Sequence, residues 1–386
     1  MFVFYMVFSY TLSMGKNTNI HLDLDERRSK IEDYLKKAIP EDLGMEWGKS
    51  VFGSLPECLK NDFFTDLTTP CANLISLGGK RWRPLLLVLC AEMANNDLSK
   101  PKDPRDMKNL DLSLALENAY KLTPLVEFVH TASLIHDDIE DGADTRRGKP
   151  CAHITYGLDV AINSASWLYF MAGQCINEID ALETTREDLY ELYAQELRRL
   201  HLGQSMDIQW HRNKLVFPTF EEYDAMVRFK TGTLSSLSVQ AGILAGGGSA
   251  DTAKKASGIA ASIGAGFQIL DDVQNLTTGN PGKKRGDDIV EGKKSLPVLM
   301  HIAKYPEDKD KISKLFEIAG KEGIESKSVE ECIKLLEKGG CIKEAFNKGK
   351  DLVSSKSLEL TKMFSKCTAS TLIIELFNSM LPKKEI

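Results

Sequence analysis

The sequence predicts an all-α protein, a single-domain helical bundle with a central cavity. Apolar residues recur with the three- and four-residue spacing of helices along nearly the whole chain, and no run alternates apolar and polar residues as a half-buried strand does. No internal repeat or low-complexity segment interrupts this pattern. We expect residues 15–386 to form one domain, with its site in the core between facing helices.

The composition narrows the class of protein. Hydrophobic residues make up 42% and charged residues 27% of the chain, as in soluble globular proteins. The net charge of −6 provides no chain-wide attraction for nucleic acid. The eight cysteines form no CxxC pair and no metal-ligand spacing, so we expect reduced thiols in a cytoplasmic protein.

Residues 1–14 are apolar, but they are shorter than the roughly 20 residues that a membrane helix needs. No lysine or arginine precedes this stretch and no small-residue cleavage site follows it. Two interpretations remain, an over-extended start with Met14 as the true first residue and a membrane anchor. The sequence favours the first, in which this extension is not translated.

Helices are predicted from residue 23 onward. A charged helix covers 23–39, and a second covers 59–77 until Gly78 and Gly79 end it. Residues 96–110 are polar and contain proline, which predicts a surface loop.

A cluster of cations precedes a strongly apolar helix. Lys80, Arg81 and Arg83 stand directly before or at the start of the helix that Pro84 begins. The dipole of a helix favours an anion at its N-terminus, and cations there help to hold that anion. The alternative is a set of solvated basic residues.

The chain is organised around an apolar helix that ends in carboxylates. Asp137 and Asp141 are four residues apart and share one helix face, with Asp138 beside them. Three repelling carboxylates need a cation, and oxygen ligands suit Mg²⁺. Arg146 and Arg147 follow, and guanidinium groups match phosphate oxygens. A diphosphate substrate is indicated, although an acidic cluster alone also fits a solvated helix end.

The pattern recurs in a second apolar helix. Asp271 and Asn275 share a face there, with Asp272 beside them. Two such helices facing one another across a cavity would hold two or three metal ions, suited to removing an anionic leaving group. Asn275 stands where a third aspartate would, and it lowers the negative charge of this second site.

Further helices lie between the two acidic clusters. An apolar helix is predicted over 159–182, and a charged amphipathic one over 185–202 that continues through 203–210. Gln204 and Asp207 in that extension have two open roles, in a pocket wall or in capping and the core.

A helix over 219–245 is interrupted at Gly232. Glycine inside a helix costs about 1 kcal/mol and marks a kink that would expose Lys230 and Thr231. We expect residues 305–386 to form amphipathic helices that serve packing and dimer support and carry no catalytic or binding residues.

Seven segments together carry a resemblance to a known family. From Leu77 to Ile302 the chain resembles the trans-isoprenyl diphosphate synthases, also called polyprenyl synthetases, and most of all the geranylgeranyl diphosphate synthases. Order and spacing agree throughout, so the joint match is specific although each motif alone is weak. In order, the segments are GGKRWRP (78–84), VHTASLIHDDIED (129–141), RRGKP (146–150), GQSMDIQW (203–210), KTG (230–232), FQILDDVQN (267–275) and KKRGDDIVEGKKSLP (283–297).

The resemblance implies the isoprenoid synthase fold and a head-to-tail prenyltransferase that joins isopentenyl diphosphate to an allylic diphosphate. It implies two or three Mg²⁺ ions on Asp137, Asp141 and Asp271, with Asp138, Asp272 and Lys230 also catalytic. The residues implied around the allylic diphosphate are Arg146, Lys230, Thr231, Gln268, Lys284 and Lys293. Those implied around isopentenyl diphosphate are Lys80, Arg83, His130 and Arg147.

Product length is predicted from the helix turn before the first aspartate. Ala132 and Ser133 lie five and four residues before Asp137, and one helical turn of 5.4 Å is close to one isoprene unit. These small side chains leave the cavity open, which favours geranylgeranyl diphosphate first and a longer polyprenyl chain second. The product is membrane-soluble, and the resemblance implies a homodimer.

Other classes remain as rivals. A class I terpene cyclase has no second diphosphate site, so the basic cluster at 78–84 would have no role. A non-catalytic subunit of a heteromeric synthase usually loses aspartates that are present here. A head-to-head synthase would need two allylic diphosphates and no isopentenyl diphosphate.

Overall fold

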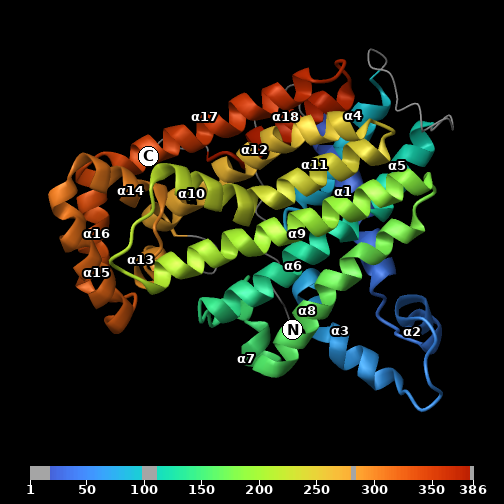
Figure 1. Ribbon diagram of the computed structural model, residues 1–386, viewed down its shortest axis with the longest axis horizontal. Helices are drawn as coiled ribbons and strands as arrows, with labels where there is room; N and C mark the ends of the chain where they lie inside the picture. The colour runs from blue at the N-terminus through green and yellow to red at the C-terminus, as the bar shows by residue number, and fades with distance from the viewer. Residues whose placement is uncertain (1–17, 98–110, 280–283, 383–386) are drawn as a thin grey trace.

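The computed structural model describes residues 18–97, 111–279 and 284–382, and in these ranges it is an all-α bundle (Figure 1). The predictions for residues 1–14 and for most of 96–110 lie outside the described residues. The helices are α1 (Thr18–Ala38), α2 (Met45–Phe52), α3 (Asn61–Ser76), α4 (Trp82–Asn95), α5 (Leu112–Lys121), α6 (Thr123–Glu140), α7 (Ala152–Tyr156), α8 (Leu158–Ala172), α9 (Glu183–Arg212), α10 (Phe220–Val227), α11 (Thr233–Ala245), α12 (Ala250–Thr277), α13 (Asp287–Glu291), α14 (Leu296–Lys304), α15 (Lys309–Glu322), α16 (Lys327–Lys338), α17 (Cys341–Lys362) and α18 (Thr368–Met380).

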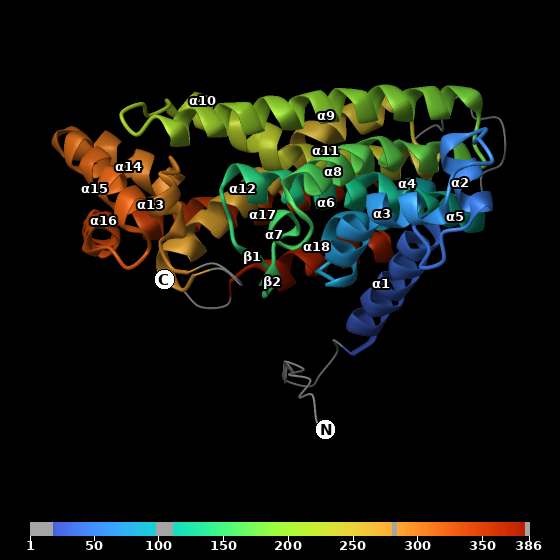
Figure 2. The same cartoon turned by 90° about the horizontal axis from the view of Figure 1, so that it is seen from below.

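Helix α11 is the centre of the bundle. It is buried along its whole length and packs against α4, α9 and α12. Helix α9 lies along one side of the molecule and α17 and α18 along the opposite side, while α13 to α16 gather at one end (Figures 1 and 2). The bundle therefore encloses a core that runs between α6, α9, α11 and α12.

Two glycines allow α4 and α11 to approach closely. A Cβ atom on Gly242 would lie 2.3 Å from the Leu87 carbonyl oxygen, and one on Gly246 would lie 2.3 Å from the Ala91 carbonyl oxygen. Helix α4 is buried on nearly all sides, which explains why its sequence is apolar throughout instead of amphipathic.

The predicted break before α11 is confirmed as a change of helix type. Arg228–Gly232 forms a π-helical turn, labelled η2, that joins α10 to α11 without ending the rod. A Cβ on Gly232 would lie 2.6 Å from the Ala261 carbonyl oxygen, so the glycine permits close contact with α12.

One local prediction was wrong, and one small feature was not predicted. The apolar helix expected over 159–182 ends at Ala172, and a 3₁₀ turn, η1, continues it over Gly173–Glu178. A short hairpin, with strands β1 (Thr145–Arg146) and β2 (Lys149–Pro150), was not expected, because two-residue strands leave no periodic signal.

The hairpin turn has a specific geometry. Arg147 and Gly148 have φ angles of 52° and 75°, as a type I′ turn requires at both central positions. The turn fixes the direction of the two arginines that follow the first aspartate cluster.

Across the described ranges, no helix is both long and apolar enough to span a bilayer.

Candidate active site

A cavity of about 350 Å³ opens between the ends of α6, α9 and α12. Its wall combines apolar side chains with convergent charged groups, as in a pocket for a small molecule. The charged, imidazole and amide side chains that line it are Arg83, His130, His136, Asp137, Glu140, Arg146, His201, Gln204, Asp207, Lys230, Gln268, Asp271, Asp272, Asp288, Lys293 and Lys294.

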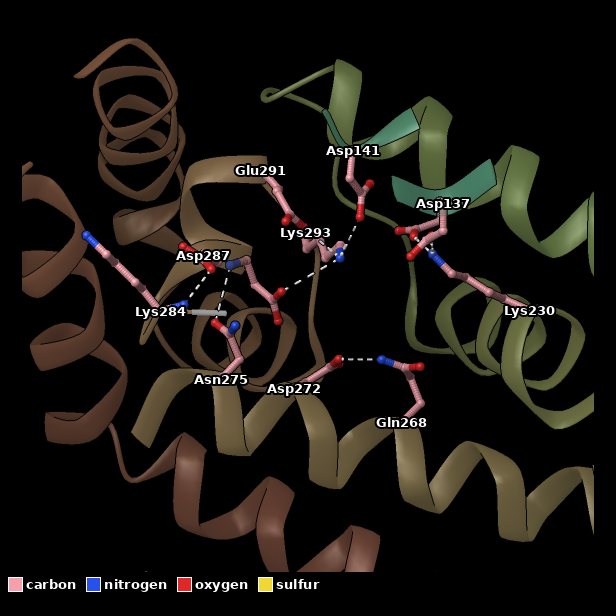
Figure 3. A network of polar contacts seen from close by, with 12 residues as sticks. Asp137, Asp141, Lys230, Gln268, Asp272, Asn275, Lys284, Asp287, Glu291 and Lys293 are labelled. Atoms are coloured by element: carbon pink, nitrogen blue, oxygen red, sulfur yellow. Dashed lines mark hydrogen bonds and ion pairs between the residues drawn. The ribbon is translucent and has the colours of Figure 1, made fainter. Parts of the chain in front are cut away.

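Lys230 from the π turn reaches the first aspartate cluster. Its Nζ atom lies 3.2 Å from Oδ1 of Asp137 (Figure 3) and 2.6 Å from Oδ2 of Asp207. Burial alone would lower the pKa of Lys230, but Asp137 and Asp207 raise it well above its ordinary value. The π turn thus holds a charged ammonium at the cavity wall.

Lys293, from the turn between α13 and α14, pairs with the other end of the same cluster. Its Nζ lies 3.4 Å from Oδ2 of Asp141 and 2.6 Å from Oε2 of Glu291 (Figure 3). Burial raises the pKa of Asp141 to about 6, against the opposing effect of Lys293, and Asp137 adds to the rise. Lys230 and Lys293 therefore bring positive charge to the two aspartates predicted to bind metal.

Asp138 points away from the cavity. The residue is 2% exposed and accepts a 2.8 Å hydrogen bond from Nε of Arg146. The same guanidinium lies 3.7 Å from Oδ2 of Asp137 and lines the cavity. Asp138 therefore acts through Arg146, and the structure does not bring it to the reacting centre.

Asp272 of the second cluster is held by neutral side chains. Asp272 accepts hydrogen bonds from Nε2 of Gln268 (2.9 Å) and the hydroxyl of Tyr223 (3.1 Å), and burial raises its pKa to about 7. The hydroxyl of Thr231 donates to Oε1 of Gln268 at 2.7 Å. Asp271 lines the cavity beside this network.

The donor set fits Mg²⁺ held in part by substrate. Among residues 18–97, 111–279 and 284–382, no three His, Cys, Asp or Glu side chains form a ready metal cluster. Asp137 and Asp271 line one cavity from α6 and α12, and Mg²⁺ takes one or two carboxylates with phosphate and water oxygens as its other ligands. The predicted trio of Asp137, Asp141 and Asp271 thus needs substrate oxygens to complete each site.

Arg83 and His130 mark another side of the cavity. Nη1 of Arg83 lies 3.4 Å from Nε2 of His130, and its guanidinium carbon lies 4.4 Å from the centroid of the Trp82 ring. Burial lowers the pKa of Arg83 to about 10, and burial together with nearby arginines lowers the pKa of His130 well below its ordinary value. His130 is therefore neutral at pH 7 and can accept or donate a hydrogen bond.

The polyprenyl synthetase family model matches residues 65–336, which is more than half of the chain. The chain belongs to the polyprenyl synthetase family. It is 32% identical over 296 residues to the short chain isoprenyl diphosphate synthase of Methanocaldococcus jannaschii, an alignment that covers 76% of this chain and 83% of that protein.

Other relatives carry geranylgeranyl names. The geranylgeranyl pyrophosphate synthase paxG of Penicillium paxilli is 35% identical over 226 residues, and the match covers 58% of each protein. The chain thus matches less than two thirds of that relative's length. The crystal structure of geranylgeranyl pyrophosphate synthetase from Pyrococcus horikoshii has a TM-score of 0.74 at 26% identity, with 96% of this chain and all of that chain covered.

Three residues that the resemblance links to diphosphate binding do not line the cavity of this family member. Lys80 is exposed, and Nη1 of Arg147 donates to the Leu74 and Gly78 carbonyls. Lys284 is exposed and pairs with Glu325 at 2.7 Å (Figure 3 shows Lys284).

Sequence reasoning missed the role of Arg81. This buried arginine has a φ angle of 46° and pairs at 2.6 Å with both Glu127 and Glu32. It holds the polyprenyl synthetase segment 78–84 against α1 and α6. Its neighbours in the sequence are also basic, so no local signal separated it from them.

Gln204, whose role the sequence left open, faces the first cluster. Its Nε2 donates to Oδ1 of Asp137 at 3.1 Å and to Oε2 of Glu140 at 2.6 Å. Asp207 also lines the cavity, where it pairs with Lys230. Both therefore belong to the pocket wall.

The two residues predicted to set product length have different positions. Ser133 lines the cavity, whereas Ala132 is 0% exposed and packs in the core. The wall also includes Tyr169, whose ring centroid lies 5.6 Å from that of His136 and 5.1 Å from that of His201. In this polyprenyl synthetase an aromatic side chain therefore forms part of the cavity wall.

Proposed function

We propose that the protein is a polyprenyl diphosphate synthase that condenses isopentenyl diphosphate with an allylic diphosphate, head to tail, to give geranylgeranyl diphosphate. One observation carries the proposal: two aspartate clusters share a single cavity with Lys230, Lys293 and Arg146. The names of the Penicillium and Methanocaldococcus relatives support it.

The allylic end of the cavity is built to accept a departing anion. Arg146, Lys230 and Lys293 would lie around the diphosphate, where cations stabilise the charge that grows as the allylic carbon–oxygen bond breaks. Two or three Mg²⁺ ions bound by Asp137, Asp141 and Asp271 would supply further charge stabilisation to the leaving group.

Isopentenyl diphosphate is proposed to bind on the side of Arg83 and His130. Its double bond would attack the allylic carbon, and a proton lost from the new chain would pass to the released diphosphate. The apolar wall beyond Ser133 excludes water that would otherwise quench a carbocation.

Product length follows from the same wall. The small Ser133 side chain would leave the cavity open one turn before the aspartates, and Tyr169 with its histidine neighbours would supply bulk elsewhere in the wall. This supports a twenty-carbon product, with a longer polyprenyl product as the second candidate. Ser133→Phe should shorten the product, whereas Ala132→Phe should act through core packing, because Ala132 does not line the cavity.

A homodimer in a reducing compartment, the cytoplasm, is the proposed state. The bulky apolar side chains exposed on α8 and α9 support the dimer: Ile162, Phe170 and Leu202 are 44%, 80% and 52% exposed. All eight cysteines are free thiols, which agrees with a reducing compartment. Light scattering of the purified protein tests the dimer.

One incubation tests the reaction. The protein is mixed with Mg²⁺, labelled isopentenyl diphosphate and farnesyl diphosphate, and the chain length of the product is read by chromatography. A single twenty-carbon product agrees with the proposal, and a ladder of longer chains would favour the longer-chain synthase. No incorporation with any allylic starter would favour a non-catalytic subunit or a cyclase.

A further inference from the structure

Asn275, the last residue of the second cluster motif, faces away from the cavity. It is 0% exposed and does not line the cavity. Its Oδ1 accepts a 3.2 Å hydrogen bond from the backbone N–H of Asp288, and its backbone oxygen accepts one of 3.0 Å from Gly286. Figure 3 shows the side chain directed toward the start of α13. Asn275 thus ties α12 to the segment that precedes Lys293.

Helix α13 depends on such an outside contact. It has five residues, and the first N–H groups of a helix have no partner within it. The preceding residue, Gly286, has no side chain to cap them. Asn275 contributes from α12 the side-chain acceptor that an N-cap residue usually supplies.

The far end of α13 fixes the direction of Lys293. Gly292 ends the helix with a φ angle of 83°, and the Asp288 carbonyl accepts from the N–H groups of Gly292 (2.9 Å) and Lys293 (2.8 Å). The Lys293 side chain then turns toward Asp141 and Glu291. Asp288 is therefore held at its N–H by Asn275 and holds Lys293 through its carbonyl.

The hydrogen bond from Asp288 to Asn275 leaves the other side-chain group of Asn275 without a partner among the described residues. Nδ2 of Asn275 is buried and has no hydrogen-bond acceptor within the described chain. A buried donor without a partner is destabilising, so the oxygen contact with α13 is the favourable interaction that this amide makes. An apolar residue at 275 would remove the cost together with that contact.

We propose that Asn275 is a positioning residue that holds α13 so that Lys293 points at the allylic diphosphate, and that it is not a metal ligand. The inference rests on the proposed function, since it assigns Lys293 to the allylic diphosphate. Loss of the contact should weaken binding of the allylic substrate and leave the binding of isopentenyl diphosphate and Mg²⁺ unchanged.

Three variants test the proposal. Asn275→Leu keeps the branched shape of the side chain and removes the acceptor, whereas Asn275→Asp keeps an acceptor oxygen at a helix N-terminus, which favours negative charge. Gln274→Ala is the matched control, because Nε2 of Gln274 donates to the Gly279 carbonyl on the same helix turn and not to α13.

Steady-state kinetics of the full-length protein give the main readout. Asn275→Leu should raise the KM for farnesyl diphosphate about five- to tenfold, with the KM for isopentenyl diphosphate and the half-saturating Mg²⁺ concentration within twofold of wild type. In Asn275→Asp and in Gln274→Ala, both KM values and the half-saturating Mg²⁺ concentration should stay within twofold of wild type. A changed Mg²⁺ requirement in either Asn275 variant, or an equal KM rise in Gln274→Ala, would overturn the proposal.

Hydrogen exchange of the substrate-free protein gives a second readout. Amides of residues 286–293 should exchange at least tenfold faster in Asn275→Leu than in wild type, and Gln274→Ala should match wild type there. Unchanged exchange would also overturn the proposal. If the wild type turns over no allylic substrate, the proposed function fails, whereas faster exchange in Asn275→Leu would still establish the link between Asn275 and α13.

Discussion

The first aspartate cluster, at the end of α6, is surrounded by cations, whereas Asp272 of the second cluster, on α12, accepts its side-chain hydrogen bonds from neutral groups. Asp137 lies within 3.2 Å of the Lys230 ammonium, and Asp138 accepts from Arg146. Asp272 instead accepts from the amide of Gln268 and the phenol of Tyr223. Both clusters face one cavity, so the difference lies in their partners.

The partners of the buried carboxylates shift the pKa values of these groups in different directions. Burial would raise the pKa of Asp207, but Lys230 and Lys293 lower it below its ordinary value. Burial raises the pKa of Asp272 to about 7, because two neutral hydrogen bonds do not offset the loss of water. Asp207 beside Lys230 therefore stays ionised at pH 7, whereas the pKa values of Asp141 and Asp272, raised by burial to about 6 and about 7, bring these two carboxylates closer to neutralisation.

The largest expected effect is loss of the carboxylate that faces the cavity from α6. Asp137→Ala should lower turnover by about 10³-fold at saturating Mg²⁺, because it removes a metal ligand and the partner of Lys230. Asp138→Asn is the control, since it keeps an oxygen for Arg146 and lies outside the cavity, and it should retain most activity. Near-normal turnover of Asp137→Ala would contradict the metal assignment.

Lys230→Met tests the electrostatic half of the comparison. The variant leaves Asp207 buried without its cation, which should lower the free energy of unfolding by about 3 kcal/mol at pH 7 in urea titrations. Adding Asp207→Asn should restore most of the loss, because the remaining group is neutral. An unchanged stability of Lys230→Met would mean that the cation does not hold this cluster.

Most of the fold and both clusters could be predicted from the sequence, because long amphipathic helices and paired aspartates leave periodic signals. The kink at Gly232 was also predictable, since glycine inside a helix marks a change of geometry. The β1–β2 hairpin was not, because two-residue strands are too short for any period.

The direction of individual side chains was the part that the sequence could not give. Asp137 and Asp138 are neighbours in the chain, yet one lines the cavity and the other is buried against Arg146. Asn275 shares a helix face with Asp271 by spacing, but the tertiary contact with α13 decides where it points. Spacing along a helix fixes the face, and packing decides which neighbour each face meets.

Lys294 extends the comparison to a buried lysine that donates to backbone carbonyl oxygens. It is 3% exposed, its Nζ lies 3.1 Å from the Gly292 carbonyl oxygen and 4.6 Å from the Phe217 ring centroid, and burial together with Lys214 lowers its pKa to about 7. An unfolded lysine has a pKa of about 10.4, so the folded state disfavours the proton.

Lys294→Met should therefore raise the free energy of unfolding of the metal-free protein by about 2 kcal/mol at pH 6. The gain should shrink between about pH 7 and 10.4, because the folded lysine is then already neutral while the unfolded one still binds a proton. Urea titrations at pH 6 and pH 9 measure it. The exposed Lys314→Met is the control, and an equal gain at both pH values would contradict burial as the cause.

Tyr223→Phe gives the smallest expected effect and completes the comparison. It removes one neutral donor from Asp272, which keeps its 2.9 Å bond from Gln268, so the free energy of unfolding should fall by about 1 kcal/mol. Urea titration beside Lys230→Met at pH 7 measures the ratio of the two losses. If Tyr223→Phe loses as much free energy of unfolding as Lys230→Met, burial and not charge pairing dominates at both clusters. A loss about three times smaller means that the α6 cluster is held by its cations and the α12 cluster by hydrogen bonds.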